Sequence, residues 1–229
     1  MLQREAEWLR KNLAGIDAKR LFPLLNVGSS TASLREKDQP WIDGEVFAPL
    51  RRRGGRVIHL DMKPDVGVDL VGDLDDPDFF ASLQTLGVRS VLCSNVLEHV
   101  NAPEALARKL VDLIPPGGFI VVTVPRGFPY HPDPIDTLFR PDVATLNKLF
   151  PGARCIAGDV IECGTVFGLL RGNVARLAAK SARVIVDNLG RSRVRPSAAK
   201  SGPRTSLLDW LWPWSVRPFL ATCVILEKL

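Results

Sequence analysis

The chain lacks the features that mark a membrane or secreted protein. None of its apolar runs approaches the roughly 18 residues needed to span a bilayer; the longest, such as Phe219 to Leu226, have the length of a strand. The first residues, MLQREAEWLRKNL, contain no continuous apolar segment of the kind found in signal peptides. We therefore expect a cytoplasmic protein.

Closely spaced cysteine pairs are also absent. The four cysteines, Cys93, Cys155, Cys163 and Cys223, are scattered, and each lies in or beside an apolar run. Structural zinc sites use cysteines at short spacing. Buried free thiols in a reducing compartment are the better interpretation.

What the chain does contain is the composition of an ordinary globular protein. Its 229 residues, 46% hydrophobic and 24% charged, are enough for one domain with a sizeable core, and we expect residues 1–229 to form it. The net charge of +5 conceals an asymmetry. From Thr165 to Leu229, eleven Lys or Arg residues accompany only three acidic ones, so the basic character belongs to the C-terminal part.

Strand and helix patterns alternate along the chain. An amphipathic helix is predicted within residues 1–19 from apolar residues at helical spacing, and residues 35–48 read as irregular. Short helices are expected near Pro49 and after Asp76, and a longer one from Pro103 to Ile114 with Asn101 as its cap. The expected strands are Leu21–Val27, Arg56–Leu60, Val68–Val71, Val88–Cys93 and Phe119–Val124. Such alternation favours a parallel sheet with helices on both faces.

The first strand leads into a loop that is suited to a ligand. In LLNVGSSTAS, from Leu24 to Ser33, an apolar run ends in Gly28 and small hydroxyl residues. Glycine permits close approach of the backbone, and small side chains leave room for a charged group near a helix N-terminus. Ordinary loop chemistry is the competing interpretation of this stretch alone.

An acidic residue, Asp61, follows the second strand. It is placed to accept hydrogen bonds from both ribose hydroxyls of a nucleoside; the alternative is a cap on the Lys63-Pro64 turn. In parallel sheets ligands bind outside the carboxyl ends of the strands. The side chains and loops expected to gather there are those of Gly28, Asp61, Asp73, Ser94 and Asn95.

Taken together, NVGSS, HLD, GDLDD, SNVLEHV and LIPPGGFIVVTVP resemble a class I S-adenosylmethionine-dependent methyltransferase. The resemblance covers roughly Leu21 to Phe150, and its most specific part runs from LEHV to PPGG. It implies an α/β, Rossmann-like sheet of seven mostly parallel strands with helices on both faces and an antiparallel last strand. Ala153–Val160 and Phe219–Leu226 can supply the last two strands, with residues 165–215 as a basic, Trp-containing insertion before the final one.

The resemblance also implies a cofactor, S-adenosyl-L-methionine, and the residues that bind it. Gly28 and its neighbours are expected to meet the methionine end, Asp61 the ribose, and Met62 the adenine ring. Asp73 and Leu74 are expected near the amino edge of the adenine, and Ser94 and Asn95 beneath the sulfonium. The implied set is Asn26, Gly28, Ser29, Ser30, Asp61, Met62, Asp73, Leu74, Ser94 and Asn95.

Two positions depart from the family pattern. The family usually has an acidic residue where Asn26 stands and glycines where Ser30 and Ala32 stand. Because of these substitutions, the alternative is that the domain no longer binds the cofactor and serves as a catalytically inactive binding scaffold. The absence of any GxGxxG counts against a nicotinamide-dependent dehydrogenase.

The Pro-rich stretch Gly127 to Pro141, GFPYHPDPIDTLFRP, leaves the fifth strand beside the expected methyl group. We assign His131 as general base because an imidazole titrates near neutral pH. Asp133 and Asp136 can orient it or bind acceptor hydroxyls, and Tyr130, His131 and Arg140 are assigned to the acceptor. Alternatively, these side chains satisfy backbone donors and Arg140 pairs with Asp136.

No metal ligands are assigned, although His131 with Asp133 or Asp136 is a conceivable set. Glu98 and His99 are interpreted as helix packing or capping groups, and His59 as a core histidine. The loop PYHPDPID is similar to bacterial methyltransferases associated with sugars and cell-surface glycans. It implies O-methylation of a saccharide or glycan-linked acceptor; a small metabolite or a protein is the alternative substrate.

The segment after Val166 combines helical spacing with basic residues, and residues 191–204 are basic and rich in Ser, Gly and Pro. Trp210, Trp212 and Trp214 follow. Basic and aromatic residues together allow peripheral contact with an anionic membrane or lipid-linked acceptor. A solvated helix with a Trp-rich cover over the sheet edge is the alternative; nucleic acid is less attractive because the first part of the chain is acidic. The oligomeric state stays open.

Overall fold

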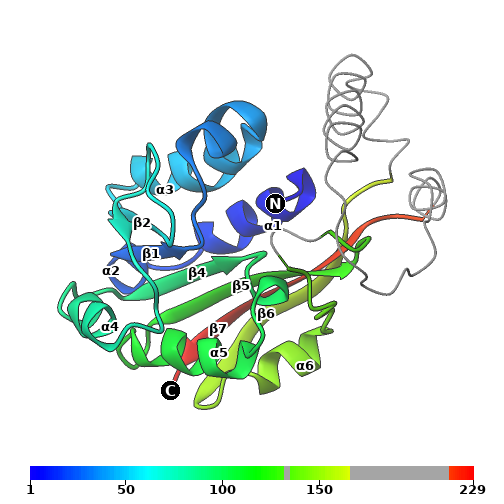
Figure 1. Cartoon of the computed structure of the whole chain (residues 1–229). Coiled ribbons are helices and arrows are strands. Elements are labelled where there is room, and N and C mark those ends of the chain that lie inside the picture. Colours follow the sequence, from blue (N-terminus) through cyan, green and yellow to red (C-terminus); the bar gives the residue numbers. More distant parts are fainter. Residues whose placement is uncertain (132–134, 166–216) are drawn as a thin grey trace, which may run out of the picture. The chain divides into compact units, whose positions relative to one another are not determined.

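The computed structural model describes residues 1–131, 135–165 and 217–229. Within them, seven strands form one sheet in the order β3-β2-β1-β4-β5-β7-β6 (Figure 1). The strands are β1 (Leu24–Val27), β2 (Val57–Asp61), β3 (Leu70–Val71), β4 (Ser90–Ser94), β5 (Phe119–Gly127), β6 (Ala153–Glu162) and β7 (Leu220–Lys228). Only β7 runs antiparallel to its neighbours, β5 and β6. The predicted fold class is therefore confirmed.

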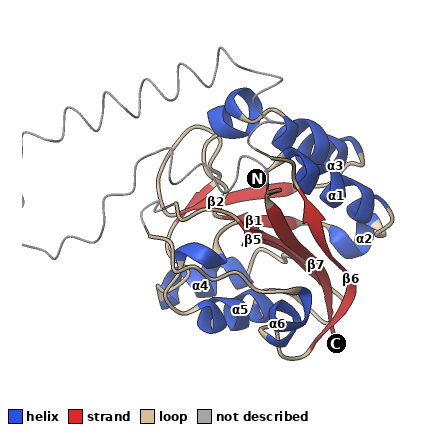
Figure 2. Cartoon of the chain, turned by 90° about the vertical axis from the view of Figure 1, so that its right-hand side faces the viewer, coloured by secondary structure: helices blue, strands red, loops and turns tan. Residues whose placement is uncertain are grey.

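Helices cover both faces of the sheet. Figure 2 shows α1, α2 and α3 on one side and α4, α5 and α6 on the other. Their bounds, with those of three shorter helical segments, are α1 (Gln3–Ala14), α2 (Ala18–Leu21), η1 (Leu34–Asp38), η2 (Ile42–Phe47), α3 (Ala48–Arg52), α4 (Pro77–Gln84), η3 (Leu97–His99), α5 (Pro103–Asp112) and α6 (Val143–Lys148). Among the described residues, no helix is both long and apolar enough to cross a membrane.

The chain divides into two compact units, residues 1–163 with 220–229, and residues 164–219. The sheet belongs to the first unit. The helix expected after Val166, the basic stretch and the tryptophan cluster lie outside the described residues.

The central strands read as continuous apolar runs because helices cover them on both sides. All four residues of β1 are buried, as are the first seven of β5. Cys93, Cys163 and Cys223 are buried and Cys155 is partly so, all as free thiols, as predicted.

Two local predictions were wrong. Residues 35–48 are mostly helical: η1 and η2 are π-helical segments, and η2 buries Ile42, Val46 and Phe47. Their wider turns do not produce the 3.6-residue periodicity by which an α-helix is recognised. Asn101 does not cap α5, whose N-cap is Ala102; Pro103 at the first helical position has no N–H to be capped.

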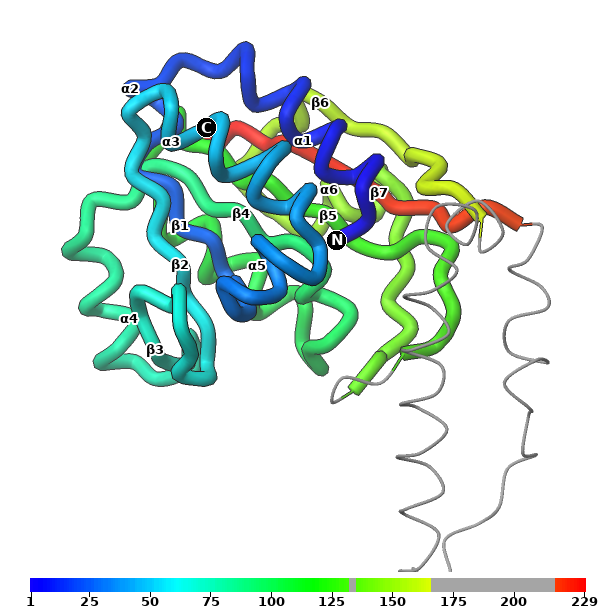
Figure 3. Tube along the Cα trace, turned by 90° about the horizontal axis from the view of Figure 1, so that it is seen from above, coloured from blue at the N-terminus to red at the C-terminus, as the bar shows by residue number. Residues whose placement is uncertain are grey.

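The first strand is also shorter than predicted. It begins at Leu24 rather than Leu21, because Ala18–Leu21 forms the short helix α2, capped by the Asp17 carboxylate, which accepts from the Lys19 N–H at 2.7 Å. The N-terminal helix is confirmed as α1. It contacts β6 and β7 (Figure 3), and Trp8 Nε1 donates to Asp159 of β6 at 2.7 Å.

The register of the sheet brings the ends of three strands to one level. Val27 at the end of β1 lies beside Leu60 of β2 and Cys93 of β4. The next residues along these strands are Gly28, Asp61 and Ser94. Because the chain goes outward from β1 to β3 and then returns to β4 on the other side of β1, this level is the switch point where parallel α/β sheets bind ligands.

His59, in β2, was expected to be a core histidine and is partly buried. Its Nδ1 accepts from Asn26 Nδ2 at 3.0 Å, and its ring meets Phe47 edge-on with centroids 4.8 Å apart. Burial, assisted by the nearby Arg35 guanidinium, lowers the pKa of His59 to about 4. The folded protein therefore holds this imidazole neutral in a range where the unfolded chain protonates it.

This difference predicts a pH dependence of stability. Between about pH 6.5 and pH 4 the unfolded chain binds a proton at His59 that the folded chain excludes, so the free energy of unfolding falls as the pH is lowered. We expect a loss of about 1 to 3 kcal/mol, after allowance for partial exposure. Urea denaturation at several pH values gives the free energy of unfolding of the wild type and of His59→Asn. If that free energy changes equally with pH in the two proteins, the prediction is contradicted.

Candidate functional site

A cavity of about 1060 Å³ opens at the switch point. Most of the residues assigned to the cofactor from sequence line it, namely Gly28, Ser30, Asp61, Met62, Asp73, Leu74, Ser94 and Asn95, together with His131. Asn26, Ser29, Tyr130, Asp136 and Arg140 do not line it, and Asp133 lies outside the described residues. The topology thus brings together groups that are up to 103 residues apart.

Gly28 cannot be replaced without rearrangement. Its φ is +67°, and a Cβ there would lie 2.5 Å from Cγ2 of Val96. Ser30 also has a positive φ, 55°, a conformation that side chains rarely adopt. The loop therefore keeps a glycine-like backbone at Ser30 although the residue is not glycine.

A buried arginine, missed from sequence, holds this loop. Arg35 of η1 donates through Nη1 to the carbonyls of Ser29 at 2.8 Å and Ser30 at 2.7 Å, and through Nη2 to that of Gly67 at 2.6 Å. Burial lowers the pKa of Arg35 below its usual range, but a guanidinium remains charged in proteins. The role of Arg35 could have been suspected because residues 35–48 also contribute buried apolar side chains. The prediction that these residues are irregular concealed it.

Asp61 serves the loops on both sides of the cavity. One carboxylate oxygen accepts from the Ser30 N–H at 2.8 Å and the other from the Lys63 N–H at 3.2 Å. Asp61 therefore does cap the turn at Lys63, as the alternative interpretation predicted. A carboxylate has about four acceptor sites, so two remain for hydroxyls of a ligand in the cavity.

The floor of the cavity contains a carboxylate that the sequence interpretation overlooked. Glu5 of α1 is buried, and its Oε1 accepts from Asn95 Nδ2 at 2.8 Å, from Ser94 Oγ at 3.2 Å and from Thr123 Oγ1. Its Oε2 accepts from the Leu2 N–H at 3.0 Å. The available signal was its position between Leu2 and Leu9 at helical spacing, on the apolar face of α1.

The remaining assigned groups form the wall and the surroundings. Met62 is 66% exposed at the cavity wall, whereas Leu74 is buried. Asp73 accepts from the Asp75 N–H at 2.8 Å, which shapes the turn after β3. The Asn26 side chain is buried and donates to His59, away from the cavity.

Asp136 organises the loop after β5. It accepts from Arg140 Nη2 at 2.6 Å, from the His131 N–H at 3.0 Å and from the Leu138 N–H at 2.8 Å. Burial opposes ionisation, but these donors together hold the pKa of Asp136 at about 2. Arg140 thus pairs with Asp136, the second of the two interpretations of these side chains.

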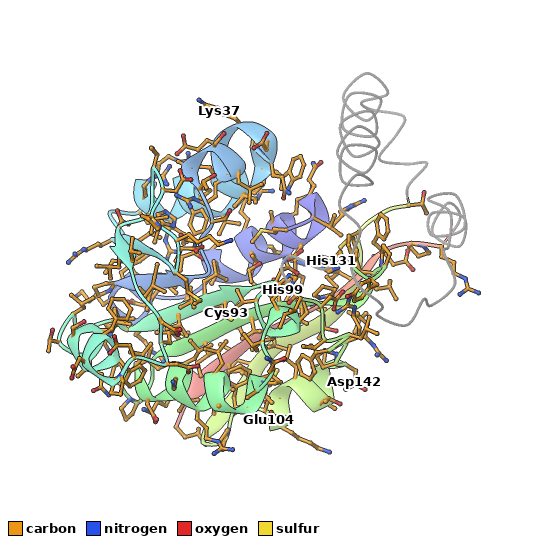
Figure 4. All side chains as sticks on the ribbon, viewed as in Figure 1. Lys37, Cys93, His99, Glu104, His131 and Asp142 are labelled. Carbon is orange, nitrogen blue, oxygen red and sulfur yellow. The ribbon has the colours of Figure 1, made fainter. Side chains whose placement is uncertain are left out.

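Glu98 and His99, interpreted from sequence as helix packing or capping groups, lie on the cavity wall with His131. Figure 4 labels His99 and His131 in neighbouring positions. Their ring centroids are 5.2 Å apart and the rings are nearly perpendicular. Glu98 is fully buried, and neither of its carboxylate oxygens has a hydrogen-bond partner among residues 1–131, 135–165 and 217–229. Burial raises the pKa of Glu98 to about 7.

No protein-family model and no curated protein sequence matches the chain. Solved structures share its fold. A protein described as a sarcosine dimethylglycine methyltransferase from Galdieria sulphuraria has 12% identity and a TM-score of 0.58, covering 98% of this chain and 84% of that one. For the MccD protein the identity is 11% and the TM-score 0.58, covering 99% and 96%. A SAM-dependent methyltransferase from Anabaena variabilis has 10% identity and a TM-score of 0.50, covering 96% and 82%.

These likenesses show that the chain has the fold of S-adenosylmethionine-dependent methyltransferases. The strand order and the antiparallel β7, described above, agree with that fold as the resemblance implied it.

The role of Arg35 can be tested by its removal. Arg35→Met leaves the carbonyls of Ser29, Ser30 and Gly67 without their donor, so we expect the free energy of unfolding to fall by about 2 to 4 kcal/mol. Arg52→Met, at an exposed position of α3, is the control and should change it by less than about 0.5 kcal/mol. Equal effects of the two substitutions in urea denaturation would contradict the role assigned to Arg35.

Proposed function

We propose that the protein is a methyltransferase that uses S-adenosyl-L-methionine. The observation that carries this proposal is the convergence of Gly28, Asp61 and Ser94 at one level around a large cavity at the switch point. The likeness of fold supports it.

The residues present fit this cofactor. The cavity of about 1060 Å³ is as large as sites that enclose ligands of this size. Gly28 lines the cavity and has no side chain of its own, and Asp61 retains acceptor capacity for two hydroxyls. The loop departs from the family pattern at Ser30, but the backbone there already has a positive φ.

In this proposal the backbone from Gly28 to Ser30 meets the methionine end, Asp61 holds the ribose hydroxyls, and Met62 packs on the adenine. The floor formed by Glu5, Ser94 and Asn95 offers negative charge and acceptors to a cationic group. When bound, the cofactor supplies a methyl group activated by its positively charged sulfur.

His131 is the proposed base. Its Nδ1 lies 3.0 Å from the Pro129 carbonyl and 3.2 Å from Asp136, two acceptors, so Nδ1 carries the proton and the lone pair is at Nε2. With the cofactor bound, its sulfonium would supply the methyl group and its sulfur would keep the electron pair of the broken carbon–sulfur bond, while His131 Nε2 would take the proton of the acceptor hydroxyl. Asp136 positions the ring, as carboxylates do in comparable sites.

We further propose that the methyl group is transferred to a hydroxyl, and that a hydroxyl of a saccharide or of a glycan-linked compound is the leading candidate. Two features support this acceptor. The PYHPDPID loop is similar to bacterial methyltransferases associated with sugars and glycans, and Glu98, His99 and His131 form a polar cavity wall. A small metabolite or a protein remains the alternative acceptor, and a scaffold without catalysis remains the alternative to an enzyme. The free cysteines are compatible with action in the cytoplasm.

Calorimetric titration with S-adenosylmethionine and S-adenosylhomocysteine tests the cofactor. We expect saturable binding to the wild type and binding weaker by about 1 to 3 kcal/mol, roughly 5-fold to 150-fold, for Asp61→Ala, because charge-assisted hydrogen bonds are lost. Asp38→Ala, at an exposed position outside the cavity, should bind as the wild type does. Absence of binding to either compound by the folded wild type would favour a scaffold.

The base is tested separately. We expect His131→Asn to bind S-adenosylhomocysteine within about twofold of the wild type while methyl transfer falls by about 10²-fold to 10⁴-fold, the usual contribution of a general base. Transfer is followed with a radiolabelled methyl group and a panel of saccharides, phenols, amines and proteins, which also ranks the acceptor classes. Undiminished transfer by His131→Asn would remove His131 from the mechanism.

A further inference from the structure

The Glu98 carboxylate is the feature that the proposed methyl transfer does not use. It is fully buried, lies on the cavity wall, and neither oxygen has a hydrogen-bond partner among the residues that the structure describes. An unpaired buried carboxylate is unfavourable by several kcal/mol. Such a group in a native protein calls for a partner that the polypeptide does not provide.

Two histidines next to it are held in the tautomer that binds metals. His99 Nδ1 faces the carbonyl of Ile135, and His131 Nδ1 faces the carbonyl of Pro129 and the Asp136 carboxylate. These partners only accept, so each Nδ1 carries the proton and each Nε2 presents a lone pair. Metal-binding histidines in general donate their other N–H to a carbonyl or carboxylate in this way.

The geometry of the three groups is close to that of a metal centre. The ligand atoms of Glu98, His99 and His131 all lie within 4.8 Å of one another, and His99 Nε2 is 3.7 Å from Glu98 Oε1. Ligands about 2.0 to 2.2 Å from a tetrahedral metal lie roughly 3.4 Å apart, so shifts of at most about 0.7 Å per ligand atom complete the set. The peptide framework is already fixed, because the Thr137 N–H and Oγ1 both donate to the Glu98 carbonyl, at 2.9 and 3.1 Å.

The charges around the cluster leave room for a cation. Glu5, Glu98 and Asp136 are buried carboxylates, and among the Lys and Arg side chains of the described residues only Arg140 pairs with one of them, Asp136, at 2.6 Å. Arg140 therefore neutralises Asp136, and Glu5 is solvated by neutral donors. Glu98 is left as the carboxylate that a bound cation would pair with.

We propose that Glu98, His99 and His131 bind one divalent transition-metal ion on the cavity wall. Two imidazoles and one carboxylate favour an ion of intermediate softness such as Zn²⁺ and disfavour Mg²⁺ and Ca²⁺, which prefer oxygen ligands. The three protein ligands leave a position open toward the cavity. That open position can take an oxygen of the acceptor, a role that rests on the proposed function, whereas metal binding itself does not. With the ion bound, His131 is a ligand, and the ion takes over the lowering of the acceptor's pKa.

Calorimetric titration of the full-length protein with ZnCl₂, after dialysis against a chelator, tests the site. All samples carry Cys155→Ser, which removes the one cysteine that is not buried. We expect one Zn²⁺ per chain in the Cys155→Ser parent, no heat of binding with MgCl₂, and affinity lower by at least about tenfold when Glu98→Gln, His99→Asn or His131→Asn is added. His59→Asn, which removes the third histidine of the chain, is the matched control and should bind like the wild type.

Titration of the same samples with S-adenosylhomocysteine separates the two proposals. No Zn²⁺ binding, or equal binding by all variants, overturns the metal site, and cofactor binding in those samples shows that the protein is folded. Zn²⁺ binding that depends on the three ligands, without any cofactor binding, supports the metal site and contradicts the proposed methyltransferase. Circular dichroism of each variant confirms that lost binding is not lost folding.

Discussion

The parallel pairing of β1 with β2 on one side and β4 on the other is the constraint on which the site depends. Because Val27 lies beside both Leu60 and Cys93, the three strands end at one level. The strand pairing alone therefore brings Gly28, Asp61 and Ser94, which follow or end these strands, to the same edge of the sheet. A shift of one residue in either pairing would exchange the two faces of a strand and move these groups off that level.

The sheet was predictable because its information is local. Central strands buried on both faces are continuous apolar runs, and their spacing by helical segments implies parallel order. What the sequence did not reveal depends on distant contacts. Glu5 is recognised as part of the floor only when α1 is placed beside Ser94 and Asn95, about 90 residues later. The π-helical segments have no periodicity that sequence reasoning recognises, and Glu98 joins His131 only after the β5 loop folds back onto η3.

Three buried carboxylates near the cavity illustrate three different solutions to the same energetic problem. Asp136 is paired with a guanidinium and two backbone donors, so it is held in place as a structural and positioning group. Glu5 is surrounded by side-chain and backbone donors, which stabilise its charge without neutralising it. Glu98 has no hydrogen-bond partner within the described part of the chain, and His99 Nε2 lies 3.7 Å from its Oε1. Since proteins keep unsatisfied buried groups mainly where function requires them, Glu98 is the group of the three that points to a ligand.

The loop after β1 reaches its conformation by a route other than repeated glycine. In a glycine-rich loop the backbone is free to adopt positive φ, and binding must restrict it. Here Ser30 adopts positive φ although it has a side chain, and Arg35 binds the carbonyls on both sides of that strained position. Arg35 of η1 therefore contributes to holding Ser30 in place, together with Asp61, which accepts from the Ser30 N–H. These contacts are made within the protein itself, so a ligand that touches the loop has less backbone freedom to restrict than it would have in a flexible glycine loop.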